Sequence, residues 1–183
     1  EDSITSRLLH LTPKNPEKSR KLNHKINRRT RITGVELHTM FIFQPDRYFL
    51  SKFITTHASK FGGTVLDAGG GTRRYAKLFN HCDSFVILDI DPETEPDIVA
   101  SVTKIPKEDN SFDGIICTQV LGDIPDAKDA ISELIRVLKP GGLLLLSESL
   151  HNEQHDEPHD YRRFTEFAYQ DLLDGDCDIL TIE

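Results

Sequence analysis

Three consecutive glycines, Gly69, Gly70 and Gly71, follow an apolar run and Asp67. Glycine takes backbone conformations that other residues avoid. A ligand can therefore approach the main-chain N–H groups of such a turn closely, above all at the start of a helix. A tight connection that binds nothing has the same local composition. The pattern alone leaves open a turn for a nucleotide-type ligand and a purely structural turn.

The residues around this turn narrow the class of ligand. The Lys-Ser/Thr pair of a P-loop is absent, and Arg74 occupies the position of the third glycine in a dinucleotide turn, which disfavours NAD and FAD. Asp89 lies 20 residues beyond Gly69, directly after the next apolar run. A carboxylate there can accept both hydroxyls of a ribose. With Asp67 on the preceding strand, the pattern predicts a nucleoside-containing ligand without a pyrophosphate.

Three histidines, His151, His155 and His159, recur at intervals of four with carboxylates between them. On one helix they would share a face and suggest a metal site. Pro158 argues against that helix because it lacks an N–H and clashes with the preceding turn. A solvated polar lid is the alternative that needs no chemistry. Histidine is also a common proton acceptor near neutral pH, and His155 is our best candidate for a catalytic base.

Apolar runs alternate with helical patterns from residue 45 onward. We expect a helix that starts at Pro45 and ends before Gly62, and the other elements follow in order. The expected strands are 64–66, 85–88, 98–100, 114–118, 143–147 and 179–182, and the further expected helices are 73–79, 126–138 and 165–173. Asp126 and Thr165 are expected to cap the last two helices. Strands that are apolar throughout indicate a parallel sheet covered on both faces, so we predict a doubly wound, Rossmann-like α/β domain.

Charge is distributed unevenly along the 183 residues, whose net charge is −8. Residues 1–31 carry nine Lys/Arg against three Asp/Glu, so the rest of the chain is strongly acidic. We expect a basic, partly helical extension over residues 1–44 and one domain over 45–183. The extension suits nucleic acid or anionic lipid, or it is a solvated segment, which the absence of aromatic residues from 14–31 favours.

The cysteines and the hydropathy of the chain indicate the cellular compartment in which we expect the protein. Three widely spaced cysteines do not suggest a disulfide framework and fit a reducing compartment. No uninterrupted apolar run is longer than that of residues 143–146, which is far shorter than a membrane span. We expect a cytosolic protein without a transmembrane segment.

From about residue 61 onward the chain resembles class I S-adenosylmethionine (SAM)-dependent methyltransferases of the type 11 subgroup. The stretches VLDAGGGT, VILDIDPE, IPKEDNSFDGIICTQVL and AISELIRVLKPGGLLLLS are similar to consecutive segments of that family. HDEPHDYRRFT is similar to an acceptor-side loop in a subgroup associated with glycan or cell-surface biosynthesis. The resemblance implies the strand order 3-2-1-4-5-6, with the family's seventh strand missing from the chain's end.

The resemblance also implies roles for individual residues. The glycines would approach the methionine part of SAM, with Asp67 near its ammonium, and Asp89 would hold the ribose. Further cofactor contacts and acceptor-side residues follow from position in the family pattern: Ile90, Ser101, Val102 and Gln119 for the cofactor, and Asp160, Tyr161 and Arg163 for the acceptor. The implied reaction is methyl transfer from SAM to O or N of a small-molecule, glycan or lipid-linked acceptor, without a metal.

Several positions depart from the family pattern. Arg73 replaces a frequent glycine, Ser101 replaces an acid, and Gly122-Asp123 replaces a common Glu-His pair. These departures, with the short C-terminal part, keep a second hypothesis open: a module that binds SAM or its demethylated product without turnover. A methyltransferase that acts on RNA through the basic extension is a further variant. An NAD-dependent oxidoreductase fits poorly.

Overall fold

Five strands form one sheet in the part of the chain that the structure, a computed structural model, describes: residues 45–150, 153–155, 157–173 and 177–180. The strands are β1 (Thr64–Ala68), β2 (Ser84–Asp89), β3 (Ile98–Val99), β4 (Phe112–Thr118) and β5 (Leu138–Ser147). Their order is β3-β2-β1-β4-β5, and all four pairings are parallel. The predicted doubly wound fold is confirmed, and this order agrees with the predicted one.

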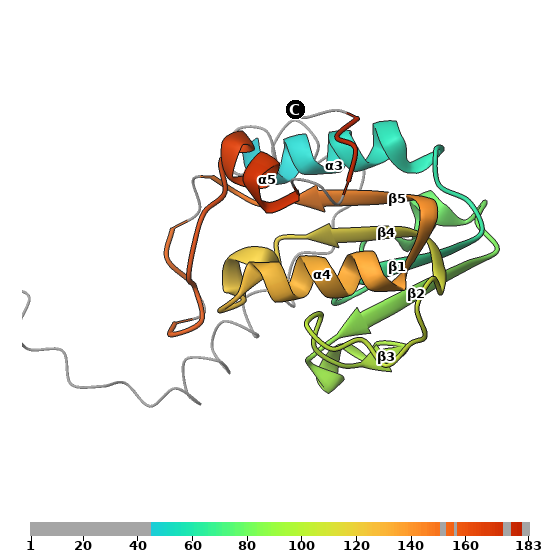
Figure 1. The fold of residues 1–183 in the computed structure, drawn as a ribbon, viewed down its shortest axis with the longest axis horizontal. Coiled ribbons are helices and arrows are strands. Elements are labelled where there is room, and N and C mark those ends of the chain that lie inside the picture. The colour runs from blue at the N-terminus through green and yellow to red at the C-terminus, as the bar shows by residue number, and fades with distance from the viewer. Residues whose placement is uncertain (1–44, 151–152, 156, 174–176, 181–183) are drawn as a thin grey trace, which may run out of the picture. The chain divides into compact units, whose positions relative to one another are not determined.

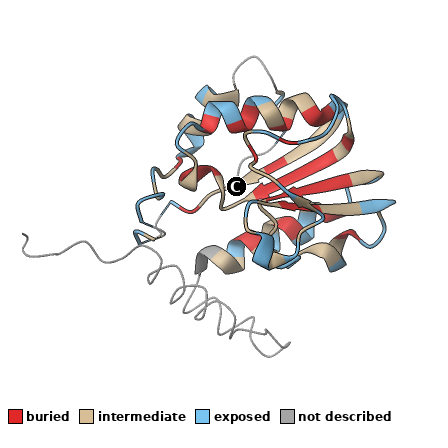
Figure 2. Ribbon diagram, turned by 90° about the horizontal axis from the view of Figure 1, so that it is seen from below, coloured by how far each residue is buried: buried red, intermediate tan, exposed pale blue. Residues whose placement is uncertain are grey.

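Helices cover both faces of the sheet. Consecutive strand residues point to opposite sides, so each strand packs against helices on both faces. Val65, Ile116 and Leu145 face α3 (Pro45–Ala58) through its buried Leu50 and Ile54. The residues that alternate with these along each strand point to the opposite face of the sheet, toward α4 (Ala127–Val137) and α5 (Glu166–Leu173). Figure 1 shows α4 in front of the sheet, and Figure 2 shows buried residues concentrated along the middle of the strands. The strands are thus apolar throughout because both faces are covered.

The predicted helix caps are present. The Asp126 side chain accepts a hydrogen bond from the Lys128 N–H at 2.9 Å at the start of α4. Thr165 Oγ1 accepts from the Ala168 N–H at 3.3 Å, and the rings of Phe164 and Tyr169 stack with their centroids 5.3 Å apart. Because such caps satisfy backbone donors that a helix leaves unpaired, they fix where each helix begins.

Two predicted elements differ from the structure. The expected helix 73–79 is wrong: residues 71–75 form turns, and only the 3₁₀ helix η2 (Ala76–Phe79) follows. Gly71 and Arg73 have φ of 49° and 58°, values that an α-helix cannot contain. The strand expected over 143–147 begins earlier, at Leu138, because Leu138 pairs with Phe112. Residues 139–142 then form a bulge before the pairing resumes at Gly114 and Leu143.

The chain's ends complete the comparison with the predictions. No strand is present at residues 177–180, so the sixth strand expected over 179–182 is not seen there, and residues 181–183 lie outside the described part. The predicted basic extension, residues 1–44, lies wholly outside it. Among the described residues, no helix has the length and apolar character to cross a membrane.

Candidate functional site

The glycine turn packs tightly against its surroundings. Gly69 has φ of 81°, and its N–H donates to the Leu88 carbonyl oxygen at 2.7 Å, at the end of β2. A Cβ at Gly69 would lie 2.3 Å from Val120 Cγ2, and one at Gly70 would lie 2.6 Å from Asp67 Cγ. Any larger residue would force the turn away from the strand ends. Gly69 is therefore required by space and by conformation, and Gly70 by space.

Asp67 is a buried acid without a partner. It belongs to β1, it is 1% exposed, and neither carboxylate oxygen has a hydrogen-bond partner among the described residues. Burial, and secondarily the charge of Asp89, raises the pKa of Asp67 to about 7. A buried carboxylate is costly unless a cation or a hydrogen-bond donor accompanies it. The site thus offers an unfilled acceptor for a positively charged or N–H-bearing ligand group.

Asp89 closes the other side of the turn, at the end of β2. Its Oδ2 accepts from the Gly71 N–H and its Oδ1 accepts from the Asp91 N–H, both at 2.9 Å. A carboxylate has about four lone-pair sites, so it keeps acceptor capacity for two hydroxyls. Ile90, the next residue, is 71% exposed and presents an apolar side chain beside this carboxylate. The predicted cofactor residues of β1 and β2 therefore lie together.

Ser101 and Val102 follow β3 and lie next to this region through the Ala100 N–H, which donates to the Asp89 carbonyl at 3.0 Å. The Ser101 hydroxyl makes a 2.8 Å hydrogen bond with Thr103 Oγ1 and accepts from the Thr103 N–H at 3.2 Å. Val102 is buried in the core beneath it. The Ser101 side chain thus shapes a local turn, and the cofactor role of both residues stays a prediction.

A second cluster of polar groups lies at the ends of β4 and β5. Gln119 follows β4 with φ of 58°, and its N–H donates to the Ser147 carbonyl at 2.7 Å. Directly after Ser147, Glu148 Oε1 accepts from the N–H groups of Val120 and Leu121, each at 2.6 Å. Sequence reasoning missed Glu148. The signal was available, because an acid that directly follows a buried strand is the same pattern that identified Asp89.

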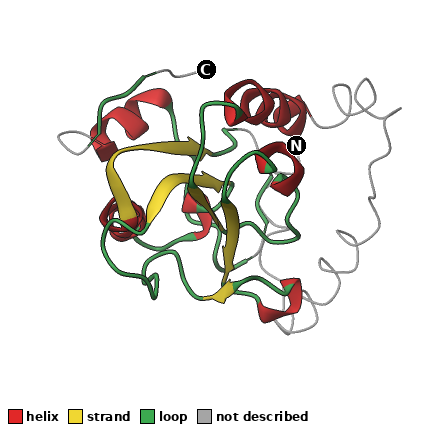
Figure 3. Cartoon of the chain, turned by 90° about the vertical axis from the view of Figure 1, so that its right-hand side faces the viewer, coloured by secondary structure: helices red, strands yellow, loops and turns green. Residues whose placement is uncertain are grey.

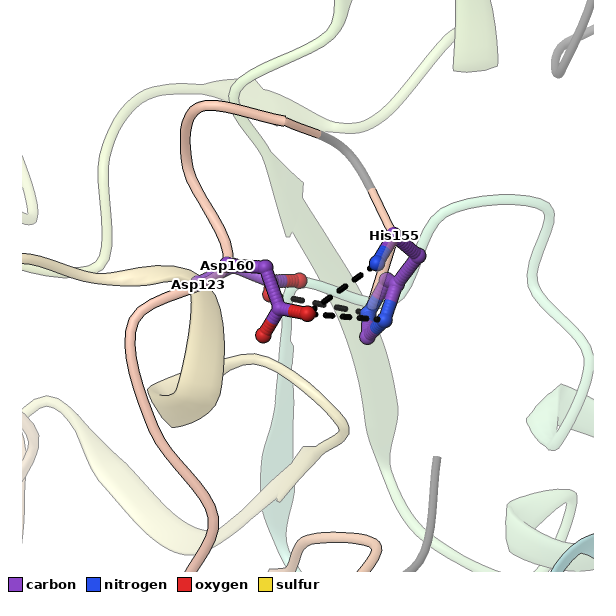
Figure 4. A group of neighbouring side chains, drawn as sticks. All are labelled: Asp123, His155 and Asp160. Atoms are coloured by element: carbon purple, nitrogen blue, oxygen red, sulfur yellow. Dashed lines mark hydrogen bonds and ion pairs between the residues drawn. The ribbon is translucent and has the colours of Figure 1, made fainter. Parts of the chain in front are cut away.

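The histidine segment joins this cluster through His155. Its Nε2 lies 3.6 Å from Asp123 Oδ1, and its Nδ1 lies 3.4 Å from Asp160 Oδ2 (Figure 4). The same Nδ1 lies 3.0 Å from the Glu153 carbonyl oxygen. Asp123 belongs to the 3₁₀ helix η4 (Leu121–Asp123), which follows β4. Asp123 was noted only as a departure from the family pattern, and its partner His155, 32 residues later, could not be assigned from spacing.

Asp160 and Arg163 hold this segment in place. Both guanidinium Nη atoms of Arg163 bond to the Asp160 carboxylate, with Nη2 2.9 Å from Oδ2, and the His155 N–H donates to that oxygen at 3.0 Å. These bonds hold the pKa of Asp160 well below its usual range. Tyr161 donates its N–H to the Gly122 carbonyl at 2.9 Å, and the residue is 44% exposed. The predicted acceptor-side residues thus lie beside the end of β4.

The described histidines do not form the helical metal face that their spacing allows. His151 lies outside the described residues, the described part of the segment is not helical, and His159 Nδ1 lies 3.2 Å from the Tyr161 hydroxyl. Ligand atoms of Asp123, His155 and Asp160 do lie within 4.8 Å of one another. Arg163 bonds to both oxygens of Asp160, so a cation at these three residues would have to share that carboxylate with the guanidinium.

Arg73 turns out to be part of the glycine turn. Its positive φ is the conformation that a glycine would adopt at no cost, and its Nη2 lies 2.6 Å from Asp97 Oδ1. Asp97 Oδ2 accepts from the Ile87 N–H at 2.8 Å, so the side chain of Arg73 connects the turn to β2. Both side chains remain about 40% exposed (41% and 42%). The missing glycine is therefore replaced by a residue with a compensating partner.

Comparison with known proteins gives the class of this domain. Residues 66–146 match the family model described as "Methyltransferase domain". A crystal structure from Bacillus halodurans C-125 superposes with a TM-score of 0.59 at 20% identity, covering 68% of this chain and 66% of that one. A chain in the complex of the Haloferax volcanii Trm112 methyltransferase activator with a methyltransferase gives 0.55 at 20% identity, covering 75% and 74%. These two structures share the fold.

Curated relatives match about half of the chain. The demethylmenaquinone methyltransferase of Renibacterium salmoninarum is 31% identical over 101 residues, or 49% of this chain and 43% of the relative. The ubiquinone/menaquinone biosynthesis C-methyltransferase of Pseudomonas fluorescens is 32% identical over 107 residues, or 48% and 42%. The chain thus spans less than half the length of these relatives. The match over residues 66–146 to a methyltransferase domain agrees with the predicted resemblance to class I SAM-dependent methyltransferases.

The residues present fit the polar groups of SAM. An α-ammonium group would complete the unpartnered Asp67 carboxylate, and ribose hydroxyls match the remaining lone pairs of Asp89. The side-chain-free turn lets a ligand approach Gly70 and Gly71. The roles of the individual residues stay predictions.

Proposed function

We propose that this domain transfers a methyl group from SAM to a nucleophilic atom of a small-molecule acceptor. The observation that carries the proposal is the buried Asp67 carboxylate, unpartnered among the described residues, beside a glycine turn and within electrostatic reach of Asp89. Bound SAM supplies an electrophilic methyl group on a sulfonium. The chain's own residues then have two tasks, to hold the donor at β1 and β2 and to orient the acceptor at β4 and β5.

His155 is the proposed proton acceptor. Oxygen, nitrogen and ring-carbon nucleophiles each lose one proton overall when they gain a methyl group. The ring of His155 is held on both sides, by Asp123 and Asp160, at the end of β4 where Gln119 also lies. Positioned acid–base groups of this kind contribute about 10²–10⁴-fold to rates. This geometry therefore supports a methyl-accepting substrate that must lose a proton.

The acceptor itself is proposed as a molecule with an ionisable hydroxyl group. The sequence prediction was transfer to O or N of a small-molecule, glycan or lipid-linked acceptor. The two curated relatives are a demethylmenaquinone methyltransferase and a quinone-biosynthesis C-methyltransferase. Methylation at oxygen and methylation at a ring carbon share one first step, because a deprotonated ring hydroxyl is nucleophilic at its oxygen and at neighbouring ring carbons. Carbon thus joins oxygen and nitrogen as a candidate methylation site.

Titration calorimetry tests the donor half of this proposal. SAM and its demethylated product should bind to the wild-type protein, and Asp89→Ala should weaken binding about 10–100-fold, because hydrogen bonds to a charged group contribute about 1.5–3 kcal/mol. The control is Asp109→Ala, which removes an exposed carboxylate that pairs with Arg136 away from the strand ends. No heat with SAM, or equal affinity in Asp89→Ala, would contradict the proposal.

A methyl-transfer assay tests the acceptor half. Radiolabelled methyl groups should appear on a phenolic or quinol-type acceptor, and NMR of the product should place them on oxygen or on carbon. Binding of SAM without transfer to any acceptor would favour the non-catalytic module instead. Tight binding of NADH would revive the oxidoreductase alternative. Salt-sensitive binding to RNA that is lost when residues 1–31 are removed would favour an RNA substrate.

A further inference from the structure

We propose that Glu148 is a positioning residue that builds the acceptor half of the site by holding the turn between β4 and η4; the inference rests on the proposed function. Its Oε1 accepts from two consecutive backbone donors, the Val120 and Leu121 N–H groups, each at 2.6 Å. Consecutive N–H groups that converge on one carboxylate form a strong, charge-assisted arrangement. The turn is therefore wrapped around this side chain.

Three features of the acceptor half depend on this turn. Gln119, just before the bonded N–H groups, has a positive φ of 58°. Gly122, just after them, accepts from the N–H groups of Tyr161 and Arg162 at 2.9 and 3.2 Å. Asp123, the next residue, faces His155. If the turn moves, the docking of the 160–162 segment and the partner of the proposed base move with it.

Space at Gly122 supports the same conclusion. A Cβ there would lie 3.3 Å from Glu148 Oε2 and 3.0 Å from the Arg162 carbonyl oxygen. The carboxylate and the docked segment thus leave little room for a Cβ at Gly122, although its φ does not require glycine.

The charges around Glu148 come from several elements. Asp123 on η4 repels it, Arg163 lies close enough for Glu148 to raise the pKa of its guanidinium, and Tyr169 on α5 and Cys117 on β4 have pKa values raised by burial and by its charge. Burial raises the pKa of Glu148 itself to about 7, although the backbone N–H groups oppose this shift. The ionised Glu148 carboxylate, which binds the backbone N–H groups of the turn most strongly, therefore forms as the pH rises through neutrality.

Glu148→Gln is the sharpest variant because glutamine has the same size but only one acceptor atom. If its oxygen serves Val120 and Leu121, its NH₂ group faces Gly122, and if it flips, both N–H groups lose their acceptor. The matched control is Glu133→Gln. Glu133 Oε1 also accepts a backbone N–H, that of Ile105, at 2.7 Å, but on α4 and away from the strand ends.

Amide hydrogen exchange followed by NMR tests the inference without any activity. In Glu148→Gln the amides of 120–123 and 160–163 should exchange about tenfold faster than in wild type, since one lost hydrogen bond of about 1.4 kcal/mol corresponds to that factor. In Glu133→Gln the change should be confined to the region of Ile105. Unchanged exchange at 120–123 in Glu148→Gln would overturn the inference.

The wild-type protein provides a second measurement if the variant does not fold. Between pH 6 and pH 8.5, exchange at 120–122 relative to the intrinsic rate should slow as Glu148 ionises, while Ile105 shows no such change. A flat profile at 120–122 would also overturn the inference. In the methyl-transfer assay, Glu148→Gln should lower kcat/KM for the acceptor about tenfold or more, a larger factor than the change in the Kd of SAM, to which the turn contributes only Gln119 and the packing of Val120 against Gly69. Failure of SAM to bind wild type would contradict the proposed function and leave the exchange result standing.

Discussion

The two halves of the proposed site, the donor half at β1 and β2 and the acceptor half at β4 and β5, use an acid with a raised pKa in opposite ways. In the donor half Asp67 has a pKa raised to about 7 and neither oxygen has a hydrogen-bond partner among the described residues. In the acceptor half Glu148 has a pKa raised to the same value but binds two backbone N–H groups directly. An unpartnered buried acid indicates a ligand that brings its own donor, whereas a bonded one indicates a part of the scaffold.

The halves also differ in how they are assembled. The donor half depends on main-chain groups of one short turn and on the ends of two neighbouring strands. The acceptor half is tied together by side chains from η4, from residues 153–155 and 157–163, and from the residue after β5. Loops join the helices and strands around the sheet (Figure 3). Loops positioned by a rigid sheet are where substrate specificity usually resides. We therefore expect substitutions in the first half to change donor affinity and substitutions in the second to change turnover.

The largest expected effect is on turnover, at His155. His155→Asn should lower kcat about 10²-fold or more, because it removes the proposed proton acceptor, and should leave the Kd of SAM unchanged. The measurement pairs the methyl-transfer assay with titration calorimetry. His159→Ala is the control, since His159 belongs to the same segment and is exposed. Equal losses in the two variants would show that the segment contributes only through its fold.

The second prediction concerns Asp67. Asp67→Asn should weaken SAM binding about 10–100-fold, because a charge-assisted contact with the ligand's ammonium is worth about 1.5–3 kcal/mol. The same substitution should stabilise the protein without ligand. Asp67 has a pKa that folding raises from 3.8 to about 7, so the wild-type protein loses stability as pH rises through this window. Asparagine avoids this loss, which is at most about 4 kcal/mol above pH 7.

Thermal unfolding at pH 4 and pH 8 checks the sign of this effect. The melting temperature of Asp67→Asn should exceed that of wild type more at pH 8 than at pH 4. Asp113→Asn is the opposite control, because Lys139 and the Thr64 N–H hold the pKa of Asp113 below its usual range. Its stabilisation is present above about pH 4 and lost on acidification, so this variant should melt lower than wild type at pH 8. A stability gain in Asp67→Asn that does not depend on pH would contradict the role of burial.

The donor half was readable from the sequence because its residues are local. Asp67 and Gly69 are contiguous with a strand, and Asp89 ends the next strand, so the parallel topology alone brings them to one edge. Asp126 and Thr165 were equally predictable as helix caps. In each case a chemical requirement and a position on one element point to the same residue.

The acceptor half was only partly readable because its contacts are long-range. His155 was identified from its residue type, but its partner Asp123 and the role of Glu148 depend on how three segments dock. The expected helix 73–79 failed for a local reason: the positive φ of Arg73 cannot be inferred from a residue that usually favours helices. Helix propensity is an average over many arginines, whereas the side chain of Arg73 is paired with Asp97.

The smallest expected effect sharpens the account of the glycine turn. A residue other than glycine at a positive φ costs about 1–2 kcal/mol, and a half-exposed ion pair such as Arg73–Asp97 returns about 0.2–1 kcal/mol. Arg73→Gly should therefore change the free energy of unfolding by less than about 1 kcal/mol, because relief of strain offsets the lost pair and the added chain entropy. Arg73→Ala keeps the strain and loses the pair, so it should be about 1 kcal/mol less stable than Arg73→Gly. Urea unfolding measures both variants, and SAM titration reports on the turn itself. If alanine proves as stable as glycine at this position, the positive φ is not what Asp97 compensates, and the pair serves to attach the turn to β2 instead.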